Sequence, residues 1–284
     1  MKVLVTGGTG FIGQYVIRDL LKRKDIEIIS TTRNIQNARF LDFYSRVEFI
    51  EFDLSRPNEK FFLEYAKIDS LIHLAWDGLP NYKENFHIEK NLFESYFFCK
   101  KFIELGLKNL TVVGTCFEYG IVNGALHEEM DSKPANPYSI AKDSLRKFLE
   151  VLQKKNNFSF KWIRLFYMYG KGQSSNSIIS QLENSIQSRE KVFNMSGGDQ
   201  LRDYLPVEKI AEYICECSLQ YRVQGIINCC SGKPISIRSL VENYLKEKNV
   251  EMKLNLGFYP YPDYEPMAFW GDDTKLKSIL RNID

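Results

Sequence analysis

The chain has 284 residues, of which 44% are hydrophobic, so it is long enough to bury a large core and too apolar for general disorder. Its 38 basic and 36 acidic residues are interspersed and give a net charge of +2, which argues against nucleic acid or a membrane surface as the main partner. No stretch has transmembrane length and the N-terminus has no signal-peptide pattern, so we expect a cytoplasmic protein. The six cysteines lack zinc-site spacing, which favours buried, reduced thiols and no bound metal.

Short apolar runs alternate with amphipathic helical patterns up to residue 166. Strands are predicted at residues 2–6, 26–32, 47–53, 70–75, 110–115 and 160–165, and the main helices at 11–24, 83–105 and 137–156. Strand and helix in regular succession imply right-handed crossovers. The sequence therefore predicts an α/β fold with a doubly wound parallel sheet of the Rossmann type.

Beyond residue 166 the alternation becomes irregular. A helical pattern at 208–219 and a strand pattern at 225–229 indicate that residues 204–230 return to the Rossmann domain of residues 1–166. Residues 167–203 and 231–284 contain many loop signals, including prolines interspersed with tyrosines near the C-terminus. We expect these two segments to form a smaller substrate-binding lobe.

A glycine-rich turn at residues 6–13 follows the first predicted strand and opens the first helix at Phe11 and Ile12. Gly7 permits a tight turn, Gly10 lets the backbone approach a pyrophosphate, and Gly13 lets the helix pack closely on the strand. The N-terminal amides of the helix favour an anion. Glycines at this spacing are weak evidence alone, because a purely structural turn has the same pattern. Between a strand and an amphipathic helix they predict that these five residues bind a dinucleotide.

The second strand bears on which dinucleotide is bound. NAD-selective enzymes usually end this strand with an acidic residue that binds the ribose diol, whereas here small hydroxyl residues precede Arg33. Arg33 either pairs with a 2′-phosphate or is a solvated surface arginine. We therefore expect NADP(H) to be preferred, with NAD(H) as the other possible cofactor. Asp53 and Leu54, after the third strand, either contact the adenine or cap the next helix.

Tyr138 and Lys142 lie four residues apart in a predicted helix that Pro137 opens, so their side chains share one helix face. A phenol with a pKa of about 10 is a poor acid or base at neutral pH unless a nearby cation stabilises its phenolate, and Lys142 would supply that cation. Thr115 ends a predicted strand at the carboxyl edge of the sheet, where its hydroxyl would orient a carbonyl oxygen. The three residues predict hydride-transfer chemistry at a secondary alcohol carbon.

Further motifs accompany these residues along nearly the whole chain. They are residues 72–75, Asn91, residues 118–120, residues 164–170, residues 202–207 and the Gly271-Asp272 pair. Together with the glycine turn and Tyr138/Lys142, they make the chain resemble an extended short-chain dehydrogenase/reductase of the NAD-dependent epimerase/dehydratase type, a group that acts on nucleotide sugars. The resemblance implies that Leu74 and Ala75 line the cofactor. It also implies that Arg202 grips the nucleotide diphosphate, with an ion pair to Asp203 or Asp199 as the alternative.

Departures from the family pattern narrow the expected reaction. Dehydratases of this type carry Asp-Glu directly after the catalytic Thr, where this chain has Cys116 and Phe117, so dehydration is not expected. The 3,5-epimerase/reductases use a Cys two places after the catalytic hydroxyl, and Cys116 is only one place after it. We interpret Cys116 as a packing thiol. The small size and the tail at residues 261–266 are most similar to dTDP-4-keto-6-deoxyhexose 4-reductases, which points to reduction of a nucleotide-activated keto sugar.

Two other functions remain open at this point. One is a nucleotide-sugar epimerase that retains its NAD. The other is a non-catalytic dinucleotide sensor, against which the complete set of Thr115, Tyr138 and Lys142 argues.

The expected substrate contacts are Trp76, Cys116, Phe117, Tyr167 and Arg202. Tyr167 stands where Asn is usual in the family, so its contacts are not carried over. A homodimer is also expected, because the family pairs its subunits through the helices predicted at 83–105 and 137–156, and these carry several apolar side chains beyond what one sheet face needs.

Overall fold

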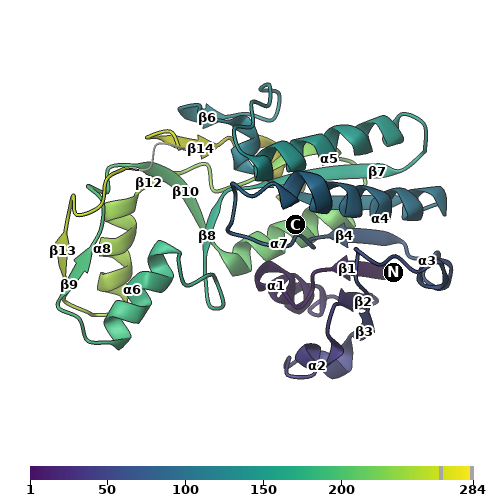
Figure 1. Cartoon of the computed structure of the whole chain (residues 1–284), viewed down its shortest axis with the longest axis horizontal. Helices are drawn as coiled ribbons and strands as arrows, with labels where there is room; N and C mark the ends of the chain where they lie inside the picture. The colour runs from purple at the N-terminus through teal and green to yellow at the C-terminus, as the bar shows by residue number, and fades with distance from the viewer. Residues whose placement is uncertain (262–264, 282–284) are drawn as a thin grey trace.

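The computed structural model describes residues 1–261 and 265–281, and a seven-stranded parallel sheet forms its centre (Figure 1). In spatial order the strands are β11 (Gly225–Cys229), β7 (Ser159–Leu165), β5 (Asn109–Thr115), β4 (Ser70–His73), β1 (Lys2–Thr6), β2 (Glu27–Thr32) and β3 (Glu48–Glu51). Each neighbouring pair is parallel. The predicted doubly wound Rossmann-type sheet is therefore confirmed.

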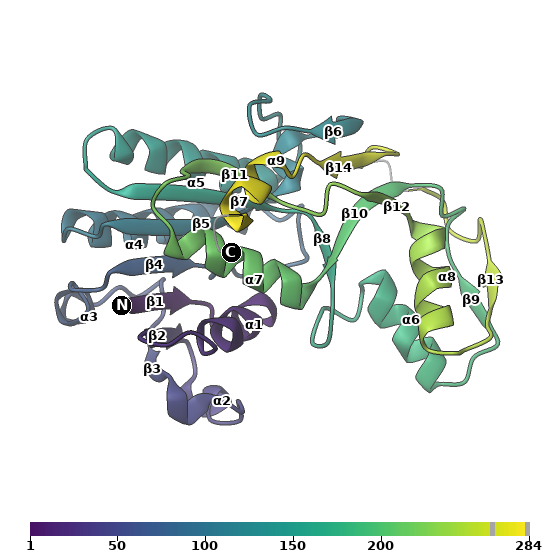
Figure 2. The same ribbon diagram turned by 180° about the vertical axis from the view of Figure 1, so that it is seen from behind.

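Helices cover both faces of this sheet (Figures 1 and 2). One layer contains α1 (Phe11–Leu20), α7 (Val207–Leu219) and α9 (Thr274–Leu280), and the other contains α3 (Glu59–Glu64), α4 (Leu92–Glu104) and α5 (Pro137–Gln153). Along β1, Val3 and Val5 pack in the first layer and Leu4 packs in the second, as the two-residue period of a strand requires. Burial on both faces explains the apolar run at the centre of β1, Val3–Val5.

The predicted helix at residues 83–105 is the clearest difference from the sequence analysis. A loop that contains a cis Leu79–Pro80 bond continues to residue 86, a π-helical turn η2 follows at His87–Asn91, and α4 starts only at Leu92. Polar contacts hold the loop in place, because the His87 ring nitrogen Nε2 hydrogen-bonds the Asn81 carbonyl oxygen at 3.0 Å. Helical periodicity does not reveal contacts of this kind.

β4 also ends earlier than the predicted strand at 70–75, because the chain turns toward the glycine loop after His73. The backbone amides of Leu74 and Ala75 both donate to the Thr6 hydroxyl, at 3.1 and 3.2 Å. This interaction fixes the end of β4 against the end of β1 and brings residues 74–77 next to the glycine turn.

Smaller elements lie beyond the carboxyl end of the sheet (Figure 1). They are β6 (Gly124–Leu126), β8 (Tyr167–Tyr169), α6 (Ile178–Gln187), β9 (Val192–Asn194), β10 (Leu201–Pro206), β12 (Pro234–Ser236), α8 (Ile237–Glu247), β13 (Lys253–Asn255) and β14 (Phe269–Gly271). Leu182, Phe193, Met195 and Val241 form a separate apolar core there. Residues 262–264 of the tail motif lie outside the described residues. Within the described part of the chain, no helix is both long and apolar enough to span a membrane.

Candidate active site

Two adjoining pockets lie beside the glycine turn, and Gly7, Gly10, Leu74 and Trp76 line both of them. The first pocket is completed by residues that follow β2, β3 and β4 and by residues of η2 and α4. The second pocket is a cavity of about 540 Å³ completed mainly by residues of β5, α5 and β8 and by the end of β7. Doubly wound sheets bind their ligands at this carboxyl edge, so the pair of pockets is the candidate active site.

The glycine turn has no room for larger side chains. Gly7 has a φ of +73°, and a Cβ atom on it would lie 2.9 Å from the Ala75 backbone nitrogen. A Cβ atom on Gly13 would lie 2.1 Å from the Gly7 carbonyl oxygen. Gly10 caps α1 without a side chain, which leaves the first amides of α1 for a ligand. Phe11, Ile12 and Gly13 line the second pocket. The turn therefore fits a dinucleotide pyrophosphate.

Thr115, Tyr138 and Lys142 all line the second pocket, although they come from two different elements. Thr115 is the last residue of β5, and α5 begins at Pro137 with Asn136 as its N-cap, so Tyr138 and Lys142 face the pocket from successive turns. The Lys142 ammonium donates to the Val113 carbonyl oxygen at 2.8 Å. The structure brings together the three residues that the sequence analysis selected.

Burial controls the protonation of this trio. It raises the pKa of the Tyr138 phenol above its ordinary value, and a hydrogen bond with Thr115 acts in the opposite direction. Burial lowers the pKa of Lys142 to about 7, against an ordinary value of 10.5. Tyr138 is therefore a neutral proton donor in the unliganded pocket, and Lys142 titrates close to neutral pH.

Cys116 and Phe117 also line the second pocket, directly after Thr115. Burial raises the pKa of the Cys116 thiol, so it stays protonated at neutral pH. Phe117 packs edge-on against Tyr82, with 5.3 Å between ring centres. Among the described residues that line this pocket there is no carboxylate. The proton-carrying side chains of this pocket include the Tyr138 phenol, the Lys142 ammonium and the Thr115 hydroxyl.

Trp76 connects the second pocket to a histidine that the sequence analysis did not select. Its indole Nε1–H donates to Nδ1 of His87 at 3.0 Å. The His87 ring lies 5.3 Å from the Tyr138 ring, and burial is the main cause that lowers its pKa. A neutral His87 with its proton on Nε2 satisfies both Trp76 and the Asn81 carbonyl oxygen. His87 belongs to no motif, so the sequence alone gave no signal for it.

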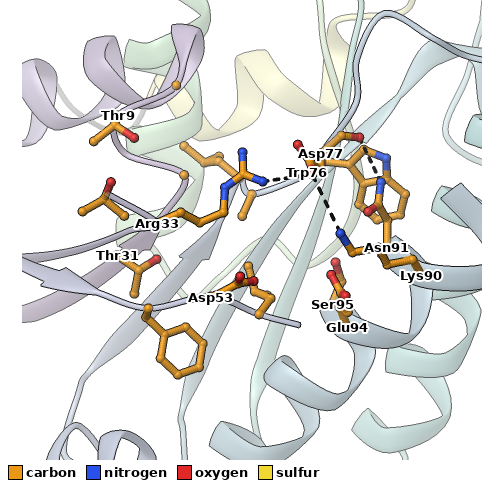
Figure 3. Close-up of a pocket in the computed structure, with 17 residues that line it drawn as sticks. Thr9, Thr31, Arg33, Asp53, Trp76, Asp77, Lys90, Asn91, Glu94 and Ser95 are labelled. Carbon is orange, nitrogen blue, oxygen red and sulfur yellow. Dashed lines mark hydrogen bonds and ion pairs between the residues drawn. The ribbon is translucent and has the colours of Figure 1, made fainter. Parts of the chain in front are cut away.

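The first pocket gathers charged side chains from several elements (Figure 3). Arg33 follows β2, and its guanidinium donates to Asp77, which follows β4, at 2.9 Å. Lys90 of η2 lies 4.0 Å from the same carboxylate. Asp53 accepts hydrogen bonds from the backbone amide and hydroxyl of Ser55, and these bonds lower its pKa. Arg33 is therefore paired with a carboxylate, while its side chain is 64% exposed, as in the alternative of a solvated surface arginine.

The other expected residues of this pocket are also in place, since Leu54, Leu74 and Ala75 line it. Asp77, Lys90 and Glu94 were not selected from the sequence. Asp77 could have been found, because it lies just beyond the end of a predicted strand at the functional edge of the sheet. Within the described residues no group of three or more His, Cys, Asp or Glu side chains is placed to hold a metal ion.

Arg202 occupies a different position from the expected one. It is buried in β10, does not line either pocket, and donates to the Glu265 carboxylate at 2.8 Å. Asp203, its neighbour on the strand, accepts from the backbone amides of Ser231 and Gly232 instead. Successive strand residues face opposite sides, which explains why the ion pair forms with Glu265 rather than with Asp203. Tyr167 lines the second pocket and donates to the same carboxylate at 2.7 Å.

Known proteins resemble this chain over most of its length. Residues 3–230 match the model of the NAD dependent epimerase/dehydratase family. The chain is 30% identical over 276 residues to a dTDP-6-deoxy-L-talose 4-dehydrogenase (NAD(+)) from Aggregatibacter actinomycetemcomitans, with 95% of this chain and 99% of that protein covered. It is 24% identical over 277 residues to a dTDP-4-dehydro-6-deoxyglucose reductase from Escherichia coli, with 89% and 82% covered.

Solved structures share the fold. A UDP-glucuronic acid 4-epimerase from Bacillus cereus, in complex with UDP-glucuronic acid and NAD, matches with a TM-score of 0.82 at 22% identity and with 99% of this chain and 93% of that chain covered. The dTDP-glucose 4,6-dehydratase DesIV from Streptomyces venezuelae, with NAD bound, matches with a TM-score of 0.80 at 19% identity, covering 98% and 90%. At these identities the likeness supports the Rossmann-type architecture.

Proposed function

The chain belongs to the NAD dependent epimerase/dehydratase family, as its motifs predicted, and we propose that it is an NAD(H)-dependent oxidoreductase acting at C4 of a nucleotide-activated 6-deoxyhexose. The observation that carries this proposal is the second pocket. It combines Thr115, Tyr138 and Lys142 with the glycine turn and, among its described lining residues, has no carboxylate that would support dehydration.

The reaction at C4 can be written in both directions. Oxidation removes a hydride from C4 and a proton from the C4 hydroxyl, and reduction of the 4-keto sugar returns both. The sequence analysis favoured a 4-reductase, whereas the relative with 30% identity is named a 4-dehydrogenase. These two names describe the same change at C4 in opposite directions. We propose oxidation as the direction to test first, with the 4-keto sugar as its product.

The residues of the pocket have separable roles in this proposal. Bound NAD(H) would supply or accept the hydride, and the glycine turn would hold its pyrophosphate. As a phenolate, Tyr138 takes the proton of the C4 hydroxyl in oxidation, and as a neutral phenol it donates that proton in reduction. The Thr115 hydroxyl orients the oxygen on C4. Lys142, in its charged form, stabilises the Tyr138 phenolate.

For the cofactor we propose NAD(H) in place of the NADP(H) expected from the sequence. The relative with 30% identity has NAD(+) in its name, and the two structural neighbours described above contain NAD. The NADP(H) expectation has no support among these proteins. The expectation rested on the missing acidic residue at the end of the second strand and on Arg33, and Arg33 is paired with Asp77.

We also propose that residues 167–203 and 231–271 form the lobe that covers the sugar, whereas α9, which the sequence assigned to this lobe, packs against the central sheet. Tyr167, Met168, Gln173 and Ser174 of the first segment line the second pocket, which supports this division. Nucleotide-sugar binding is then shared between the Rossmann domain and this lobe, with no role for nucleic acid or a membrane.

The test is a pair of absorbance assays on the purified protein. The first mixes NAD⁺ with dTDP-linked 6-deoxyhexoses, with the same sugars on UDP and GDP as comparisons. The second mixes NADH or NADPH with a dTDP-4-keto-6-deoxyhexose. We expect net formation of NADH in the first assay and consumption of NADH in the second. No turnover with any of these sugars would contradict the proposal.

A nucleotide-sugar epimerase is the second candidate, because some curated relatives carry epimerase names, including a UDP-glucose 4-epimerase at 25% identity. An epimerase would retain NAD through purification and interconvert the two C4 epimers without a net change in nicotinamide absorbance. Chromatography of the sugar products separates the two candidates.

A further inference from the structure

An ion pair spans the first pocket and links two strand ends that are not adjacent in the sheet. Arg33 follows β2 and Asp77 follows β4, and β1 with its glycine turn lies between these strands. Figure 3 shows the guanidinium of Arg33 directed toward the carboxylate of Asp77, with Lys90 on the far side of that carboxylate. The pair therefore crosses the region where the adenosine half of a dinucleotide binds in this type of fold.

The charges that line this pocket disfavour an additional anion. Three carboxylates line it, from Asp53, Asp77 and Glu94, against the two cations of Arg33 and Lys90. Burial raises the pKa of Glu94, the positive charge of Lys90 opposes that rise, and the negative charges of Asp53 and Asp77 add to it. A phosphate carries a charge of about −1.5 to −2 at neutral pH, so a 2′-phosphate would add to an existing excess of negative charge.

The same negative charge favours a free ribose diol. Hydroxyl groups donate hydrogen bonds to carboxylates, and the pocket offers several carboxylate oxygens. The usual acidic residue at the end of β2 is missing, since Thr31 and Thr32 occupy that end. Asp77 supplies a carboxylate to the same pocket from a different strand.

We propose that Asp77 is a specificity-determining residue of the cofactor pocket, which favours NAD(H) over NADP(H) by holding Arg33 in an ion pair and so denying a 2′-phosphate its partner. This inference rests on the proposed function, because it assumes that a nicotinamide dinucleotide occupies the first pocket. The two side chains are 64% and 45% exposed, so the ion pair contributes little to folding, and its removal is expected to leave the fold intact.

The test is a fluorescence titration of the full-length protein with NADH and with NADPH, without any sugar. Asp77→Asn keeps the size and the hydrogen-bonding oxygen of the side chain and removes its charge. We expect this variant to raise the affinity for NADPH relative to NADH by about tenfold, because Arg33 becomes available for a charge-assisted bond to phosphate. The dissociation constant for NADH is expected to change by less than about threefold.

Two control variants separate the ion pair from a general charge effect. Glu94→Gln removes one negative charge from the same pocket, whereas the ion pair of Arg33 is made with Asp77. It is expected to change the ratio of affinities by less than about threefold. In the double variant Arg33→Ala/Asp77→Asn, the gain in NADPH affinity is expected to disappear.

Several results would overturn the proposal. One is an Asp77→Asn variant with an unchanged ratio, and another is an equal gain from Glu94→Gln. A third is a tenfold loss of NADH affinity in Asp77→Asn without any gain for NADPH, since Asp77 would then be a ribose ligand only. If the unmodified protein bound neither dinucleotide, the proposed function would fail as well. If only the inference about Asp77 is wrong, the unmodified protein still binds NADH.

Discussion

The ammonium nitrogen of Lys142 lies 3.9 Å from the centre of the Trp76 ring. The same ammonium group donates a hydrogen bond to the Val113 carbonyl oxygen. Neither group carries a formal negative charge, and the lysine is almost fully buried. A carbonyl dipole and the face of an indole compensate for only part of the lost hydration of an ammonium group. Burial consequently lowers the pKa of Lys142 to about 7.

This pKa predicts that Lys142 destabilises the unliganded protein at low pH. The unfolded chain has a lysine of ordinary pKa, 10.5, so between about pH 7 and pH 10.5 the unfolded state binds more protons than the folded state. The free energy of unfolding attributable to this group therefore rises with pH across that window. Below about pH 7 the folded protein bears the full cost of burying the charge. Replacing Lys142 should remove the cost.

We expect Lys142→Met to be more stable than the unmodified protein by about 1–3 kcal/mol near pH 6, and the difference to shrink toward pH 9. The measurement is urea unfolding at both pH values. Lys161→Met provides a second case, because burial lowers the pKa of Lys161 to about 8, and we expect a gain of the same sign but smaller size near pH 6. A Lys142→Met variant that was less stable at both pH values would show that the contacts with Val113 and Trp76 outweigh desolvation.

Tyr138→Phe is expected to remove nearly all hydride transfer and to leave dinucleotide binding almost unchanged. Tyr138 lines the second pocket and hydrogen-bonds with the Thr115 side chain, which supports its role as the general acid. A positioned general acid contributes about 10²- to 10⁴-fold in rate. Steady-state rates and NADH titrations measure the two effects. Tyr82→Phe, which removes a phenol from the same pocket, should cost less than about tenfold. Near-normal turnover of Tyr138→Phe would contradict the assigned role.

The sequence predicted the large sheet well because parallel strands buried on both faces have distinctive apolar runs. Gly225–Cys229 was placed with the right bounds far from the other strands. The glycine turn and the Tyr138/Lys142 pair were equally accessible, since both depend on short local spacings. Local spacing puts Tyr138 and Lys142 on one helix face, and Thr115 joins them because β5 ends at the carboxyl edge of the sheet.

The sequence could not predict contacts that depend on where separate segments meet. Arg33 has no acidic neighbour in the sequence, and its partner Asp77 is 44 residues away. Arg202 likewise pairs with Glu265, 63 residues away, and not with the adjacent Asp203. An arginine with no acidic residue near it in the sequence therefore suggests an anion ligand. In the folded chain, a carboxylate from a distant segment can pair with it instead. The NADP(H) expectation arose in this way.

A homodimer remains a prediction, and the exposed phenylalanines of α4 and α5 identify its expected interface. Phe93 and Phe97 on α4 and Phe148 on α5 are each at least 40% exposed, although their helices contact each other. We expect light scattering to give the mass of a dimer and Phe97→Glu to shift it toward a monomer. Phe40→Glu is the control, because Phe40 is exposed and follows α2 (Ile35–Ala38), a helix that lies away from α4 and α5 (Figure 1). A monomer at micromolar concentration would refute the prediction.

The last prediction concerns Glu118, a buried carboxylate that holds the end of β5. Its side chain accepts from the Thr115 backbone amide at 2.8 Å, from the Trp162 indole at 2.9 Å and from the Arg164 guanidinium at 2.8 Å. Glu118 and Arg164 are both fully buried. Burial raises the pKa of Glu118, and the ion pair with Arg164 opposes that rise. The free energy of unfolding should therefore depend on this pair more than on any exposed ion pair of similar length.

Glu118→Gln keeps the shape of the side chain but leaves the Arg164 charge buried without its counterion. We expect a loss of about 3–5 kcal/mol in the free energy of unfolding, measured by urea denaturation. Glu150→Gln removes a half-buried partner of Arg146, which retains Asp143, and should cost less than about 1 kcal/mol. Glu118 also accepts a hydrogen bond from the Thr115 backbone amide and so helps to position the Thr115 hydroxyl. We therefore expect folded Glu118→Gln to be less active than the unmodified protein while it still binds NADH. Equal stability of the two variants would mean that water or a relaxed backbone replaces the carboxylate at Arg164.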